Sequence, residues 1–105
     1  MGKKVARETL QAKLNDEAMT LYNAACCEVP YRYAEHRLRS CQATVIETSN
    51  FTVLKSYYTI VCFIDKRTDI MYDVLRTVYG YTATSAQHIA KFKRDYFCRE
   101  CIVAR

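Results

Sequence analysis

The stretch "FTVLKSYYTIVCFIDKRTDIMYDVLR", residues 51–76, predicts the centre of the fold. Its runs of β-branched and aromatic residues, separated by short breaks, are typical of consecutive β-strands. Residues 59–64 are apolar at odd and even positions alike, which predicts a central strand covered on both faces. The break "DKRTD" resembles a hairpin loop in which Asp69 takes the left-handed backbone conformation. A second break at Tyr57 and Tyr58 has no Gly, Pro or Asn to mark it.

The segments before this stretch extend the sheet and add a helix. "CQATVIET" (residues 41–48) alternates and is β-branched, and "SN" follows as a turn, so we predict a fourth strand. Residues 30–38, "PYRYAEHRL", predict an exposed connector. Upstream, a helix is predicted from about residues 7–9 to just before Pro30, with a break at the cap-type residues 15 and 16. Its apolar stripe has helical spacing and consists of Leu10, Leu14, Ala18, Leu21 and Ala25.

The residues after the sheet predict a second helix. Thr84 followed by Gln87 has the form of a capping box, which predicts a helix from there to about Tyr96. Lys93 falls among the apolar positions and would have to extend outward to solvent. The sheet-facing arc is predicted to hold Ala86, Ile89, Ala90, Phe92, Tyr96 and Phe97. The solvent-facing arc is predicted to hold Gln87, His88, Lys91, Arg94 and Asp95.

These elements predict an α+β fold with an N-terminal helix, a four-stranded antiparallel meander sheet and a C-terminal helix. A chain of 105 residues is long enough to bury a core as one domain, 1–105. We expect residues 1–6 and 97–105 to be flexible ends.

The charge of the chain is uneven. The net charge is +5, and residues 31–40 hold three basic side chains against one acidic, whereas residues 74–105 hold six against two. A clustered basic excess favours acidic partners. No apolar run approaches the length of a membrane span, and the N-terminus lacks a signal-peptide core. We therefore expect a cytoplasmic protein whose six cysteines are thiols.

Several phrases carry a resemblance to a known family: "LNDEAMTLYNAACCEV", "RYAEHRLRS", "VLKSYYTIVCFIDKRTDIMYDVLR" and above all "YGYTATSAQHIAKF". Over residues 5–95 the chain resembles a family of small, uncharacterised proteins encoded by phages of gut bacteria, including crAss-like phages. The resemblance implies a phage accessory protein expressed in the bacterial host cytoplasm. It implies no catalytic residues, and because several small phage proteins disable host defences, it adds that role to the candidate functions.

Enzymatic and metal chemistry find little support in the sequence. Cys98 and Cys101 have the spacing of half a zinc site, but neither a second Cys-x-x-Cys nor a His-x3-5-His accompanies them. The only internal glycine is Gly80, so the sequence contains no glycine-rich loop of the kind that binds phosphate. The acidic residues are scattered and do not form a catalytic pair. We therefore expect no enzyme activity, no metal and no cofactor.

Two binding hypotheses remain. The first is nucleic-acid binding, through cations and aromatic rings that contact phosphate and stack on bases, near a helix start that favours anions. The second is protein binding, because nine tyrosines exceed what a small core can hide, and Tyr with Arg is typical of interface hot spots. The candidate residues for either are Arg32, Tyr33, His36, Arg37, Arg39, Tyr79, Tyr81, Thr84, His88, Lys91 and Arg94.

Protein binding ranks slightly above nucleic-acid binding. The expected partner is a host protein or ribonucleoprotein complex, with nucleic acid as the alternative, no membrane, and a homodimer as a further option. The predicted function is a phage-type, non-enzymatic protein that inhibits a host defence or nucleic-acid-processing complex.

Overall fold

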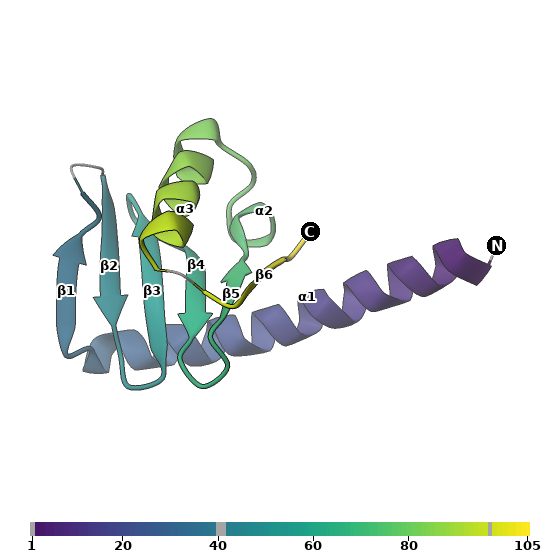
Figure 1. The fold of residues 1–105 in the computed structure, drawn as a ribbon, viewed down its shortest axis with the longest axis horizontal. Helices are drawn as coiled ribbons and strands as arrows, with labels where there is room; N and C mark the ends of the chain where they lie inside the picture. The colour runs from purple at the N-terminus through teal and green to yellow at the C-terminus, as the bar shows by residue number, and fades with distance from the viewer. Residues whose placement is uncertain (1, 40–41, 97) are drawn as a thin grey trace.

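In the computed structural model, which describes residues 2–39, 42–96 and 98–105, a six-stranded sheet has a helix packed on each face. The long helix α1 (Gly2–Glu28) crosses one face, and α3 (Ala83–Asp95) packs on the other (Figure 1). The strands lie side by side in chain order from β1 to β6. The α+β class predicted from the sequence is therefore confirmed.

The predicted meander forms the centre of the sheet. Its strands are β2 (Ala43–Glu47), β3 (Phe51–Ser56), β4 (Thr59–Asp65) and β5 (Ile70–Asp73). Each pairs antiparallel with the next, as predicted. β4 is covered on both faces, because Cys62 belongs to the core on the α3 side and Phe63 to the core on the α1 side. The chain turns at Tyr57 and Tyr58, and Asp69 has the left-handed φ of 61° predicted for it.

The sheet has an additional strand on its β2 side where the sequence predicts a connector. Strand β1 (Ala34–Arg37) pairs antiparallel with β2, so the prediction that residues 30–38 lack regular structure is wrong. All four β1 side chains are exposed, and no alternation of apolar and polar residues marked the strand. The sequence also did not predict the one-turn helix α2 (Leu75–Val78), which follows β5.

The opposite edge is formed by a strand from the C-terminal tail. Strand β6 (Glu100–Val103) pairs parallel with β5, so the prediction of a flexible end over residues 97–105 is wrong for these residues. After β6, the backbone N–H of Ala104 donates to the carbonyl of Asp73 at 2.9 Å, and Ala104 is fully buried. A parallel strand needs a long crossover to reach its partner, so nothing local in the tail specifies it. Phe97 and Cys41, which were assigned to predicted elements, lie outside the described residues.

Helix α1 is continuous, so the predicted break at Asn15 and Asp16 is wrong. The Asn15 side chain does not end the helix but bonds the far end of the chain: its Oδ1 accepts a hydrogen bond from the Arg105 backbone N–H at 3.0 Å. The helix is followed by a 3-10 turn (Val29–Tyr31) that contains Pro30, close to the predicted end.

Only the second half of the predicted α1 stripe reaches the core. Ala18 and Ala25 are fully buried against the sheet, whereas the first half of the helix extends beyond the sheet (Figure 1) and Leu10 is 58% exposed. The core on this side also contains Ile46, Phe51, Val53, Phe63, Tyr72 and Val74.

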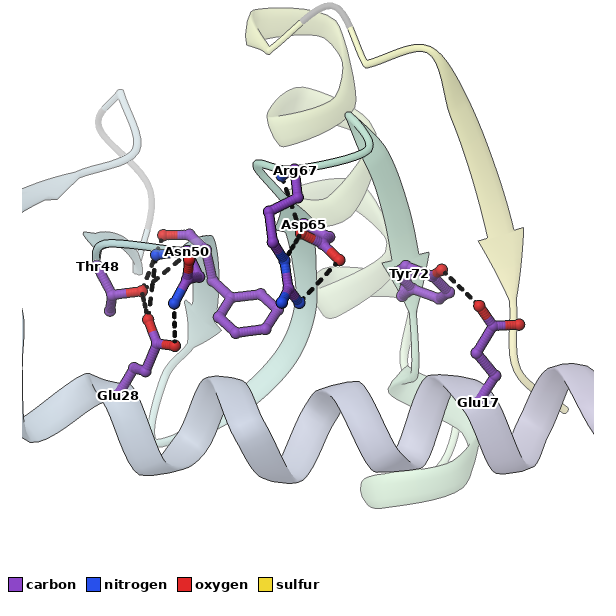
Figure 2. A network of polar contacts seen from close by, with 8 residues as sticks. Glu17, Glu28, Thr48, Asn50, Asp65, Arg67 and Tyr72 are labelled. Atoms are coloured by element: carbon purple, nitrogen blue, oxygen red, sulfur yellow. Dashed lines mark hydrogen bonds and ion pairs between the residues drawn. The ribbon is translucent and has the colours of Figure 1, made fainter.

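Carboxylates of α1 bond the β2–β3 turn and β5, as Figure 2 shows. Glu28 accepts hydrogen bonds from the Thr48 hydroxyl at 2.8 Å, the Asn50 backbone N–H at 3.1 Å and the Asn50 side-chain amide at 2.8 Å. Burial opposes ionisation of Glu28, but the bonds from Asn50 and Thr48 outweigh it and lower the pKa of this carboxyl. Farther along the helix, Glu17 accepts from the Tyr72 hydroxyl at 3.3 Å.

The second core lies between the sheet and α3. It includes Leu54, Val61, Cys62, Met71, Ile89 and Phe92. Within the residues that the structure describes, no helix has both the length and the apolar character needed to cross a bilayer.

Candidate binding surface

A pocket of about 380 Å³ opens where the β3–β4 turn meets the start of α3. Aromatic rings and hydroxyl groups dominate its lining. The aromatic residues are Tyr57, Tyr58 and Tyr79. The hydroxyl residues are Ser56, Thr59, Thr82, Thr84 and Ser85. Among the described residues that line it, none is charged.

The tyrosines of the β3–β4 turn are placed outward at some conformational cost. Tyr57 has a φ of 54°, in the left-handed region that a bulky side chain seldom adopts. Its backbone N–H donates to the Gln42 carbonyl at 2.9 Å, which holds the turn against the β1–β2 loop. The Tyr57 ring packs against the ring of His88, with centroids 5.8 Å apart. Tyr58 is 92% exposed, so its ring is available to a binding partner.

Beneath the pocket lies a buried polar network. The Ser56 hydroxyl is hydrogen-bonded to Nδ1 of His88 at 2.8 Å and to the Ser85 hydroxyl at 2.9 Å. All three residues are buried, and burial, followed by the charge of Lys91, lowers the pKa of the His88 imidazole. The network joins β3 to α3 and fixes the pocket floor.

The position of His88 corrects the predicted orientation of α3. The sequence places His88 on the solvent-facing arc and Ala90 on the sheet-facing arc, but His88 is buried and Ala90 is exposed. The helix also begins earlier than predicted: Thr82 is its N-cap, with a hydroxyl that accepts from the Ser85 backbone N–H at 3.2 Å. Thr84, the predicted cap, is exposed and lines the pocket. Counting only apolar residues misplaced the arc, because the polar Ser85 and His88 are buried through their bonds to Ser56.

The Ser56–His88 pair is not arranged as a catalytic triad. In a triad, the second imidazole nitrogen is hydrogen-bonded to a carboxylate that orients the ring. Across residues 2–39, 42–96 and 98–105, no carboxylate is bonded to His88. The geometry favours a structural role for the pair.

Most predicted binding residues of the 31–39 segment contact other parts of the chain. Arg39 pairs with Asp95 at the end of α3, and Nε2 of His36 lies 3.0 Å from the hydroxyl of Tyr96, the residue after this helix. The Tyr33 hydroxyl accepts from Lys66 Nζ at 2.7 Å, and Arg32 lies 3.6 Å from Glu35. Arg37 is exposed on β1, opposite Thr44 of β2.

The predicted basic face of α3 is not a single continuous surface. Arg94 is exposed and Lys91 is half-buried, whereas His88, the third member, is in the interior. Tyr81 is exposed at the other end of the helix, where the Arg76 guanidinium lies 4.8 Å from its ring centroid.

The structure therefore brings together only part of the predicted set. Tyr79 and Thr84 meet at the pocket, whereas Arg32 and Tyr33 lie near the far end of β2. Tyr57 and Tyr58 were not among the binding residues predicted from the sequence, although the unmarked break between two strong strands was a signal for an exposed turn there.

The cysteine pair of the tail belongs to the core on the α3 side. Cys98 and Cys101 are half-buried free thiols that pack against this core, which contains Cys62. Burial raises the pKa of the Cys101 thiol and raises that of Cys62 strongly. Leaving aside the undescribed positions, Cys41 among them, no group of three His, Cys, Asp or Glu side chains is arranged to hold a metal ion.

No family model matches the chain, and comparisons with curated proteins and with solved structures give no significant match.

Proposed function

We propose that this protein is a phage-type, non-enzymatic binding module that attaches to a host protein through its pocket end, defined as Tyr57, Tyr58, Tyr79 and Tyr81. The target class is a host defence or nucleic-acid-processing complex in the bacterial cytoplasm. The observation that carries the proposal is the cluster of three exposed tyrosine rings around one concave site. Tyrosine is enriched in hot spots, which centre on pockets that a partner can desolvate completely. The resemblance of the sequence to phage proteins supports the phage origin.

The charged groups favour protein over nucleic acid as the partner. A nucleic-acid surface needs cations that are free to displace counterions from phosphates. Here Arg39 is paired with Asp95, Arg32 lies near Glu35, and Lys66 bonds Tyr33 and the Thr48 carbonyl. The pocket instead presents aromatic rings and hydroxyl groups, and none of its described lining residues is charged.

Affinity capture from a host lysate, followed by mass spectrometry, tests the proposal. The baits are the wild-type protein, Tyr58→Ala and the matched control Tyr31→Ala, which also removes an exposed ring. Tyr31 lies away from the pocket. It is close in sequence to Tyr33, whose backbone N–H donates to the carbonyl of Glu47 at one end of β2. Ser56 of the pocket pairs with Ala43 at the other end of β2. We expect a host protein recovered with the wild type and Tyr31→Ala to be depleted about tenfold or more with Tyr58→Ala. Equal recovery by all three baits contradicts the proposal.

Nucleic-acid binding is measured separately with labelled DNA and RNA at two salt concentrations. The proposal expects no binding that depends steeply on salt. Affinity that falls steeply with salt and weakens in the Lys91→Ala plus Arg94→Ala variant would instead establish the alternative.

A further inference from the structure

Building on the proposed function, we infer that the pocket receives the side chain of a single tyrosine presented by the protein partner. The pocket volume of about 380 Å³ lies at the lower end of the range for ligand sites, so it suits one ring with its flanking atoms. Tyr57, Tyr58 and Tyr79 provide walls against which a planar ring can stack or pack edge to face.

The hydroxyl groups of the lining distinguish a tyrosine from a purely apolar ring. Ser56 and Ser85 bond each other, whereas, within the part of the chain that the structure describes, the side-chain hydroxyls of the half-buried Thr59 and the exposed Thr84 have no partner. An apolar ring would displace water from these hydroxyls without replacing its hydrogen bonds, which disfavours phenylalanine. A phenol hydroxyl both donates and accepts, so it can satisfy them. Because Thr84 is exposed and Thr59 is half-buried, this preference for tyrosine over phenylalanine should be several-fold.

The charge of the lining distinguishes a tyrosine from a nucleobase. A nucleotide brings at least one phosphate next to its ring, and that phosphate requires a nearby cation. No described lining residue is a cation or an anion. The Arg76 guanidinium, which lies close to this end of the chain's α3 helix, stacks over the Tyr81 ring rather than lining the pocket. The uncharged tyrosine side chain requires no charged residue in the lining.

The test is an NMR titration of the ¹⁵N-labelled full chain with four probes: N-acetyl-tyrosinamide, N-acetyl-phenylalaninamide, N-acetyl-leucinamide and adenosine monophosphate. We expect tyrosinamide to shift the backbone amides of residues 56–59 and 82–85 saturably, with a dissociation constant on the order of 1 mM. Phenylalaninamide should bind several-fold more weakly. Leucinamide and the nucleotide should leave these amides unshifted.

Two variants connect the shifts to the pocket walls. Tyr58→Ala and Tyr79→Ala should each weaken tyrosinamide binding at least about fivefold, while Tyr31→Ala leaves it unchanged. Because all three side chains are exposed, the variants should fold, which their amide spectra verify directly. The inference is overturned if tyrosinamide causes no saturable shift, if phenylalaninamide or leucinamide binds as tightly, or if the nucleotide binds preferentially. It is also overturned if Tyr58→Ala and Tyr79→Ala bind like the wild type.

Failure here is distinguishable from failure of the proposed function. If Tyr58→Ala abolishes capture of a host protein while tyrosinamide does not bind, the pocket end still binds protein but does not take up a tyrosine.

Discussion

Replacing Ser56 with Ala removes the hydroxyl that joins β3 to α3. That hydroxyl bonds Nδ1 of His88 at 2.8 Å and the Ser85 hydroxyl at 2.9 Å, and the three residues are buried. A buried hydrogen bond contributes about 1 kcal/mol net, and a buried partner left unsatisfied costs about 1–3 kcal/mol. The His88 ring also packs against Tyr57, which limits its freedom to find a new partner. We therefore expect Ser56→Ala to reduce the free energy of unfolding by about 2–3 kcal/mol.

Urea denaturation followed by circular dichroism measures this loss, and thermal unfolding should show a midpoint lower by roughly 10–20 °C. Ser49→Ala is the matched control, because Ser49 is an exposed turn residue with the same side chain. Its effect should stay within about 0.5 kcal/mol of the wild type. If Ser56→Ala matches this control, the network does not hold α3 on the sheet, and the account of the pocket floor is wrong.

Four further outcomes follow from the structure. The lowered pKa of His88 means that the unfolded chain binds its proton more readily, so stability should decline as the pH falls below about 6.5; His88→Gln should remove this part of the pH profile. The pKa of Glu28 is lower in the folded protein than in the unfolded chain, so the ionised carboxylate stabilises the fold at a pH above about 4.5. This stability is lost as the pH falls below that value, and Glu28→Gln should flatten the decline. Phe63→Ala should cost about 3–5 kcal/mol in urea unfolding, whereas Tyr58→Ala should stay within about 0.5 kcal/mol. Deleting residues 100–105 should lower the thermal midpoint and promote concentration-dependent association seen by light scattering, because it uncovers the edge of β5.

The centre of the fold could be predicted because its signals are local. Residues 51–76 alternate or run apolar as buried strands do, and Asp69 is suited to the left-handed turn position that it occupies. The edge strands could not be predicted in this way. β1 buries no side chain, and each β6 residue pairs with a parallel partner thirty residues earlier in the chain, as Glu100 does with Ile70.

The candidate surface was harder to predict, because polar residues can be buried when they are hydrogen-bonded to residues distant in sequence. Spacing alone placed His88 in solvent, but its partner Ser56 lies on a different element and cannot be identified from the helix. The same applies to the cations: Arg39 looks free in the sequence, yet it is paired with Asp95. The net charge of the sequence therefore overestimated how many cations are free to contact phosphates.

The β3–β4 turn connects the fold to the proposed function. A left-handed φ costs an ordinary L-residue about 1–2 kcal/mol, and Gly or Asn would hold the same turn at lower cost. The chain instead has Tyr57 at φ 54°, followed by the almost fully exposed Tyr58. The Tyr57 ring covers His88 and forms a wall of the pocket, while Tyr58 adds a second wall. Turn geometry alone does not require either ring, and the strained Tyr57 together with the exposed Tyr58 is the arrangement that the proposed binding surface uses.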